Sequence, residues 1–118
     1  SVNWSGYCHC DSCRRNCASP VTAFFGVPNG SWSWSGVTPG EYAHSGHATR
    51  YFCKTCGTPL AYASTRWPNE IHFYAASLVD PTSFTPKQHF HYGERLPWLR
   101  LEDDLPKHHS SADELHSS

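Results

Sequence analysis

Methionine is absent from all 118 residues, and so are long hydrophobic runs and any cluster of basic residues. Without Met, we expect the sequence to have lost either an initiator Met or a longer N-terminal segment. The apolar runs are only a few residues long, which argues against a membrane span or a signal peptide. Nine Lys and Arg, spread along a chain of net charge −1, form no basic stripe for nucleic acid. These absences favour a cytoplasmic protein.

The composition predicts one domain with a modest core. Only 38% of the residues are hydrophobic, so bound metal would help to stabilise the fold. The aromatic content of 14% compensates in part, because aromatic side chains bury large areas. We place the domain at residues 1–106. The segment 107–118 is polar and poor in apolar anchors, and we expect it to be a flexible tail.

Short strands separated by turns account for most of the chain. β-branched, aromatic and alternating patterns predict strands at 21–27, 31–36, 49–52, 60–63 and 71–75. No window carries a sustained helical stripe, so helix is expected only in turns such as 11–16 and 81–84. The sequence therefore predicts an all-β fold of several small antiparallel sheets with little helix.

Five of the six cysteines fall into two tight groups. Cys8, Cys10 and Cys13 share six residues, and Cys53 and Cys56 form a separate pair. A Cys-x2-Cys turn brings both sulfurs to one zinc ion at about 2.3 Å, and three thiols in one turn make a poor disulfide scaffold. In one arrangement Cys10, Cys13, Cys53 and Cys56 close a single four-cysteine site. In the other, Cys8, Cys10 and Cys13 hold a zinc with an open fourth position, and Cys53 and Cys56 belong to a second ion.

Four segments resemble the glutathione-dependent formaldehyde-activating enzyme family, which also includes centromere protein V. The hallmark-like segments are 6–15, GYCHCDSCRR, and 52–60, FCKTCGTPL. Segments 76–81, ASLVDP, and 95–99, RLPWL, resemble motifs further along the family pattern. The match runs in order from about residue 6 to residue 106. It implies a fold of several coiled β-sheets pinned by zinc-binding cysteine turns.

The resemblance also implies a division of the cysteines. Cys8, Cys10 and Cys13 match the catalytic zinc ligands of the family. Cys53 and Cys56 match two of the four ligands of a structural zinc, whose other two lie in a separate Cys-x-Cys some two dozen residues before the hallmark, a segment this sequence does not contain. We expect truncation of that segment rather than its loss. If the segment is truly absent, the single four-cysteine site becomes attractive again.

The activity implied by the resemblance is that of a zinc-dependent carbon–sulfur lyase, which adds the glutathione thiolate reversibly to formaldehyde or a related small electrophile. A zinc held by three thiolates is suited to binding one more thiolate. Arg14 and Arg15 follow the cysteine turn and are candidates for binding a glutathione carboxylate. The alternative is a non-catalytic, zinc-stapled interaction module with one structural four-cysteine site. A metal count and the response to glutathione separate the two.

The nine histidines are expected to be mostly scattered surface residues. His9 lies between two candidate ligands, and alternation along the loop predicts that its ring points away from the metal. His89 is the exception to watch, because a histidine is frequent at the comparable place in the family. The sequence leaves the general acid and the oligomeric state open.

Overall fold

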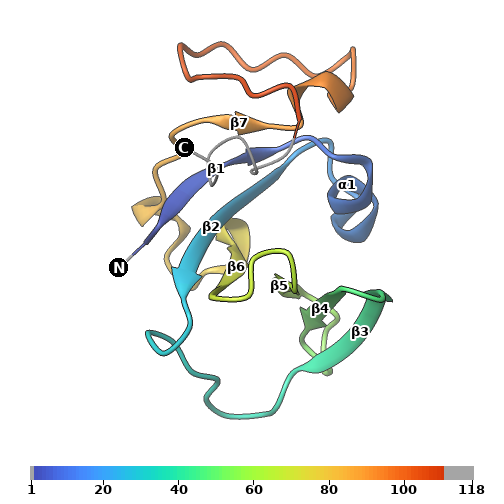
Figure 1. The fold of residues 1–118 in the computed structure, drawn as a ribbon, viewed down its shortest axis with the longest axis vertical. Helices are drawn as coiled ribbons and strands as arrows, with labels where there is room; N and C mark the ends of the chain where they lie inside the picture. Colours follow the sequence, from blue (N-terminus) through green and yellow to red (C-terminus); the bar gives the residue numbers. More distant parts are fainter. Residues whose placement is uncertain (1, 111–118) are drawn as a thin grey trace. The chain divides into compact units, whose positions relative to one another are not determined.

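The computed structural model describes residues 2–110 and is mainly β, as the sequence predicts (Figure 1). Its strands are β1 (Trp4–Cys8), β2 (Thr22–Pro28), β3 (Gly40–Ser45), β4 (Ala48–Phe52), β5 (Pro59–Ser64), β6 (Glu70–Tyr74) and β7 (His89–Phe90). One α-helix, α1 (Asp11–Cys17), and three 3-10 turns, η1 (Ala75–Ser77), η2 (Pro81–Ser83) and η3 (Tyr92–Glu94), complete the regular structure.

The strands follow the order β3-β4-β5-β6-β2-β1-β7 in one sheet, in place of several small ones. The pairs β3–β4, β4–β5 and β5–β6 are antiparallel, and β1 pairs with β7 in parallel. By its internal contacts the chain divides into two compact units. The first contains the residues up to Trp4 with Phe25–Ser83, and the second contains Ser5–Phe24 with the residues from Phe84 onward.

The first unit is built around an apolar core on β2, β5 and β6. Its buried centre consists of Val27, Ala61 and Ile71, against which further aromatic side chains pack. The strand expected at 31–36 is wrong, because these residues form a loop. The ring of Trp32 in this loop lies 5.7 Å from that of Phe73 on β6. Its alternating pattern therefore serves to cover the core and not to join a strand ladder.

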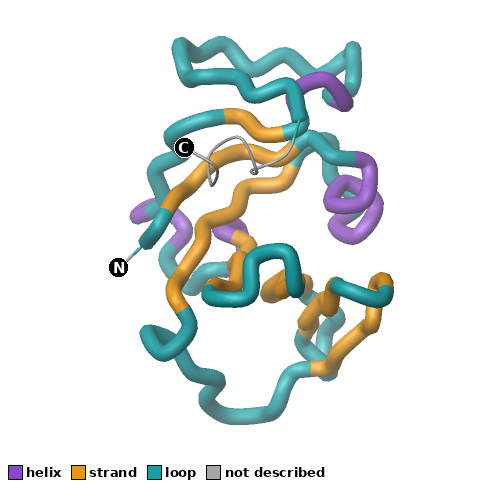
Figure 2. Tube along the Cα trace, viewed as in Figure 1, coloured by secondary structure: helices purple, strands orange, loops and turns teal. Residues whose placement is uncertain are grey.

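The second unit places the end of β1 beside a segment far along the chain. In the parallel register, Tyr7 lies opposite His89 and Cys8 opposite Phe90. Gly6 permits this approach, because a Cβ there would lie only 2.7 Å from the backbone oxygen of Gln88. After η3 the chain continues mainly as loop (Figure 2). The pairing of β1 with β7 brings the cysteine turn and the His89 region together.

Part of the expected tail has backbone partners. The N–H of His108 donates to the oxygen of His89 at 2.8 Å, and that of His91 donates to the oxygen of Ser110 at 2.7 Å. The rest of the tail expectation concerns residues 111–118, which lie outside the described residues. Within residues 2–110, no helix has the length and apolar character that crossing a membrane requires.

Candidate metal and thiol site

The three sulfurs of the first cysteine group converge where β1 leads into α1. Cys10 is the N-cap of α1, and its Sγ accepts a hydrogen bond from the backbone N–H of Cys13 at 3.3 Å. The Sγ atoms of Cys8 and Cys13 lie 3.8 Å apart. Two sulfurs bound tetrahedrally to one zinc, each at about 2.3 Å, would be separated by about 3.8 Å. The spacing of this pair therefore fits a common thiolate-bound cation.

The protonation of the sulfurs is unequal. Hydrogen bonds from the thiols of Cys13 and Cys8 hold the pKa of Cys10 well below its ordinary value. Hydrogen bonding to Cys10 and Cys13, together with burial, raises the pKa of Cys8. One sulfur thus carries the negative charge easily, whereas ionising its neighbours brings like charges together. A bound cation is what would let all three ionise.

His91 lies near two of these three cysteines, Cys8 and Cys10, and the resulting group of possible metal ligands does not include Cys13. Ligand atoms of Cys8, Cys10 and His91 all lie within 4.8 Å of one another, which allows one metal ion to contact the three. Among residues 2–110, this is the one group of three or more such side chains with ligand atoms close enough to share a metal ion. All six cysteines lie in this range and are free thiols. His91 was not among the residues singled out from the sequence.

A buried chain of hydrogen bonds runs behind the cysteine turn. His9 Nε2 lies 2.8 Å from His89 Nδ1, and His89 Nε2 donates to Asp103 Oδ2 at 2.9 Å. His89 is fully buried and His9 nearly so. The hydrogen bond from His89 holds the pKa of Asp103 at about 2, so the carboxylate is ionised at neutral pH.

The hydrogen bonds restrict the tautomer of His9. Burial, with the neighbouring His89 and Arg95, lowers the pKa of His9 to about 4, so this ring is neutral at pH 7. When His89 is also neutral, its Nε2–H donates to Asp103 and its Nδ1 must accept from His9 Nε2–H. The buried Nδ1 of His9 then keeps a lone pair and has no partner in the described part of the chain. A ligand donor would satisfy it.

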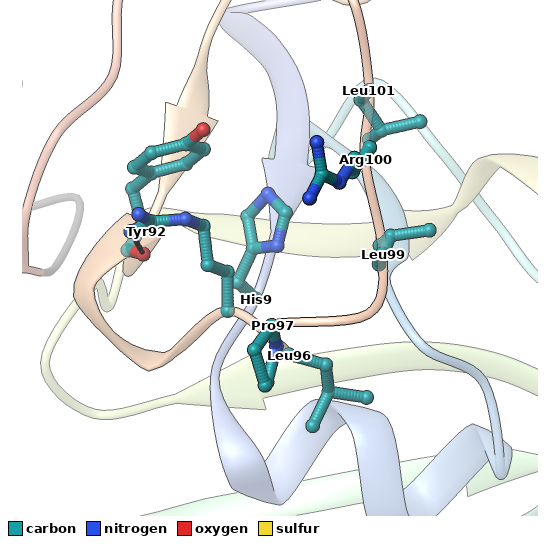
Figure 3. A pocket seen from close by; sticks show the side chains of 8 residues that line it. His9, Tyr92, Leu96, Pro97, Leu99, Arg100 and Leu101 are labelled. Carbon is teal, nitrogen blue, oxygen red and sulfur yellow. Dashed lines mark hydrogen bonds between the residues drawn. The ribbon is translucent and has the colours of Figure 1, made fainter.

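His9 also lines a cavity of about 360 Å³ in the same unit. Figure 3 shows its ring projecting between Tyr92 on one side and Arg100 on the other. Arg95, a further lining residue, stacks on Tyr92 with its Cζ 4.2 Å from the ring centre. The remaining lining residues are Leu96, Pro97, Leu99 and Leu101. The cavity thus combines two cations, an aromatic ring and an apolar wall.

The arginines singled out from the sequence are engaged elsewhere. Arg15 Nε contacts both carboxylate oxygens of Asp11 at 3.0 Å. Arg14 donates to Asp11 at 3.4 Å and to the backbone oxygen of His9 at 3.2 Å. Neither lines the cavity, whereas Arg95 and Arg100 do. The expected contact of Arg14 and Arg15 with glutathione stays a prediction.

The second cysteine pair lies in the turn between β4 and β5. Gly57 N–H donates to the oxygen of Cys53 at 2.7 Å, and Cys53 N–H donates to the oxygen of Thr58 at 2.9 Å. The Cys56 side chain is exposed, and a hydrogen bond with Thr58 lowers its pKa. No third His, Cys, Asp or Glu of the described residues completes a metal group with this pair. Its assignment as half of a structural site stays a prediction.

The histidines correct the sequence interpretation. His9, His72 and His89 are buried, so the expectation of mostly surface histidines fails for them. His9 lies in the unit interior because its ring bonds to His89, a residue 80 positions away. Local alternation along the loop carries no information about such a partner.

The fold and the site together define a small β protein with a sulfur-rich turn able to hold a metal ion, next to a cation-lined cavity. The chain belongs to the glutathione-dependent formaldehyde-activating enzyme family, whose model matches residues 3–94. It is also similar to an uncharacterized lyase of Schizosaccharomyces pombe, with 45% identity over 62 residues. That match covers 52% of this chain and 44% of the relative, so the chain spans less than half of the relative's length.

Proposed function

We propose that this protein is a carbon–sulfur lyase that binds a metal, preferably zinc, at Cys8, Cys10 and Cys13 and adds the glutathione thiolate reversibly to formaldehyde or a related small electrophile. The observation that carries the proposal is the convergence of the sulfurs, with Cys8 and Cys13 separated by 3.8 Å. Family membership and the lyase name of the fungal relative support the reaction class.

The cysteine turn is suited to the metal by its donor set and its electrostatics. A metal bound there would supply stabilisation of a thiolate at neutral pH, which keeps the sulfur of an incoming thiol nucleophilic. Cys10 would contribute the sulfur that ionises most easily, and a bound cation would favour loss of the Cys8 proton, because thiols ligate metals as thiolates. These residues hold the metal and do not themselves attack.

The cavity beside His9 is suited to the body of glutathione. Arg95 and Arg100 offer guanidinium groups to its carboxylates, and Leu99 offers apolar surface to its methylene groups. His9 Nδ1 is buried and has no partner in the described part of the chain, so a polar group of the ligand would satisfy it. The cavity would bind and orient the tripeptide, with its sulfur directed to the cysteine turn.

The reaction balances without an oxidant or reductant. The glutathione thiol first gives its proton to solvent. Its sulfur electron pair forms the bond to the formaldehyde carbon, and the C=O π pair moves to oxygen, which takes up one proton. The product is S-hydroxymethylglutathione, and the reverse sequence cleaves the same carbon–sulfur bond. The sequence also left open a non-catalytic interaction module. That alternative requires no such reaction.

Metal content tests the site directly. We expect Cys10→Ser to lose most of the zinc bound by the turn, measured per chain by elemental analysis. Cys17→Ser is the matched control, because Cys17 lies at the end of α1 and belongs to no metal group of the described residues. Equal zinc content in the Cys10 variant and the control would refute the proposed metal site. Full zinc retention by Cys8→Ser alone would favour the four-cysteine module.

Exchange spectroscopy tests the reaction. With ¹³C-formaldehyde and glutathione, the protein should accelerate interconversion of free formaldehyde and S-hydroxymethylglutathione above the uncatalysed rate, and Cys10→Ser should not. The double variant Arg95→Ala/Arg100→Ala should weaken glutathione binding at least tenfold in calorimetry, with zinc content unchanged. Arg66→Ala, a change at an exposed arginine in the loop between β5 and β6, is the matched control. Identical binding by the two arginine variants would rule out the cavity as the glutathione site.

A further inference from the structure

His91 stands out because its ligand nitrogen groups with sulfurs from a segment about eighty positions earlier. Ligand atoms of His91, Cys8 and Cys10 lie within 4.8 Å of one another, close enough for one cation to contact all three. Cysteine and histidine are the commonest ligands of zinc in proteins, and mixed sets of three sulfurs and one nitrogen are tetrahedral. His91 is therefore a candidate ligand for a metal held by Cys8 and Cys10, while Cys13 adjoins this group through Cys8, whose Sγ lies 3.8 Å from its own.

A carboxylate orients the His91 ring. His91 Nδ1 lies 3.0 Å from Glu94 Oε2, and Glu94 Oε1 accepts a hydrogen bond from the backbone N–H of Asp11 at 3.1 Å. Glu94 thus ties the ring to the first residue of α1, directly after Cys10. With Nδ1–H donating to Glu94, Nε2 is the nitrogen that keeps a lone pair for a metal. A carboxylate on the outer nitrogen is the usual support of a metal-bound histidine.

The backbone at His91 is held in an uncommon conformation. His91 has φ 53° and ψ 39°, in the left-handed region, which costs a non-glycine residue about 1–2 kcal/mol. Its N–H donates to the oxygen of Ser110 at 2.7 Å, and its oxygen accepts from the N–H of Glu94 at 2.9 Å. These bonds stabilise the turn that places His91 between β7 and η3.

We propose that His91 is the fourth ligand of the metal in the resting protein and that an incoming thiol displaces it. This inference rests on the proposed metal site at Cys8, Cys10 and Cys13. The incoming thiol would give its proton to solvent, and the released imidazole of His91 would stay hydrogen-bonded to Glu94 through Nδ1. An imidazole nitrogen is a usual zinc ligand beside thiolates and adds no charge to them.

The test compares His91→Ala with His44→Ala, an exposed histidine on β3, in cobalt- and zinc-loaded protein. We expect His91→Ala to bind zinc at least tenfold more weakly in chelator competition and to shift the visible d–d bands of cobalt. The same variant should bind glutathione several-fold more tightly, because no internal ligand competes with the thiol. A purely structural role of His91 would not tighten thiol binding. Equal zinc affinity and equal cobalt spectra in both histidine variants would overturn the inference.

A second measurement needs no variant. In protein loaded with ¹¹³Cd and labelled with ¹⁵N-histidine, scalar coupling should connect the metal with Nε2 of His91 and disappear when glutathione is added. Absence of the coupling would also overturn the inference, even if His91→Ala does not fold. The Cys10→Ser result separates the two levels. If that variant keeps its metal, the proposed function fails; if it loses metal and His91 shows no coupling, only the role of His91 fails.

Discussion

Glu70 on β6 is a buried carboxylate with three side-chain partners, and its replacement gives a sharp stability prediction. Glu70 accepts hydrogen bonds from Trp4 Nε1 at 2.9 Å, from His72 Nε2 at 2.7 Å and from Asn3 Nδ2 at 3.2 Å. Burial alone would raise the pKa of Glu70, but the bonds from His72, Trp4 and Asn3 hold it at about 2, below the ordinary 4.5. That difference corresponds to about 3 kcal/mol of unfolding free energy when the carboxylate is ionised in both states.

Glu70→Gln should therefore lower the free energy of unfolding at pH 7 by about 3 kcal/mol. The folded-state pKa is the lower one, so the contribution is complete above pH 4.5 and is lost as the pH falls towards 2. The difference in unfolding free energy between wild type and variant should thus be about half as large at pH 3 as at pH 7. Urea denaturation at both values measures it, with Glu41→Gln on β3, an exposed glutamate, as control. A loss no larger than that of the control, or one equal at both pH values, would refute the reasoning.

Three further outcomes follow from close contacts and from the metal site. Gly26→Ala should destabilise the protein by about 1–3 kcal/mol in urea, because the new Cβ would overlap the ring of Trp4; unchanged stability would contradict the packing at this position. Asp103→Asn should remove the strongly downfield Nε2–H proton signal of His89, which requires a carboxylate acceptor; a retained signal would show that another group accepts this proton. Chelation of zinc should lower the melting temperature of the wild type but not of Cys10→Ser; an equal drop in both would place the stabilising metal elsewhere.

The strands that sequence analysis located are those with strong local patterns. β2 and β6 carry β-branched and aromatic residues, and both lie within a residue or so of the expected ranges. β3 was missed because five of its six positions are exposed, so it has no alternating pattern. β7 has two residues and exists only because it pairs with β1. Pairing over such a distance leaves no trace in a short window of sequence.

In the candidate site, too, local sequence patterns could be interpreted and long-range contacts could not. The close spacing of Cys8, Cys10 and Cys13 predicted that these sulfurs share one metal; Cys8 lies near Cys13 and groups with Cys10, but the three-cysteine site stays a prediction. His91 and the cavity arginines could not be found in this way, since the β1–β7 register decides what faces the turn. The orientation of His9 away from the metal stays a prediction, but its burial was not foreseen, because it depends on the bond to His89.

The distance in sequence between the two halves of the site has a consequence for biosynthesis. The cysteine turn leaves the ribosome long before His89 and His91, which lie 80 positions or more behind His9. Until those residues emerge and β7 pairs with β1, neither His89 nor His91 lies near the cysteine turn. Oxidants and stray ions thus meet an unprotected cysteine cluster during translation. If the turn binds a metal together with His91, that site can be complete only after the segment that contains His91 has been synthesised.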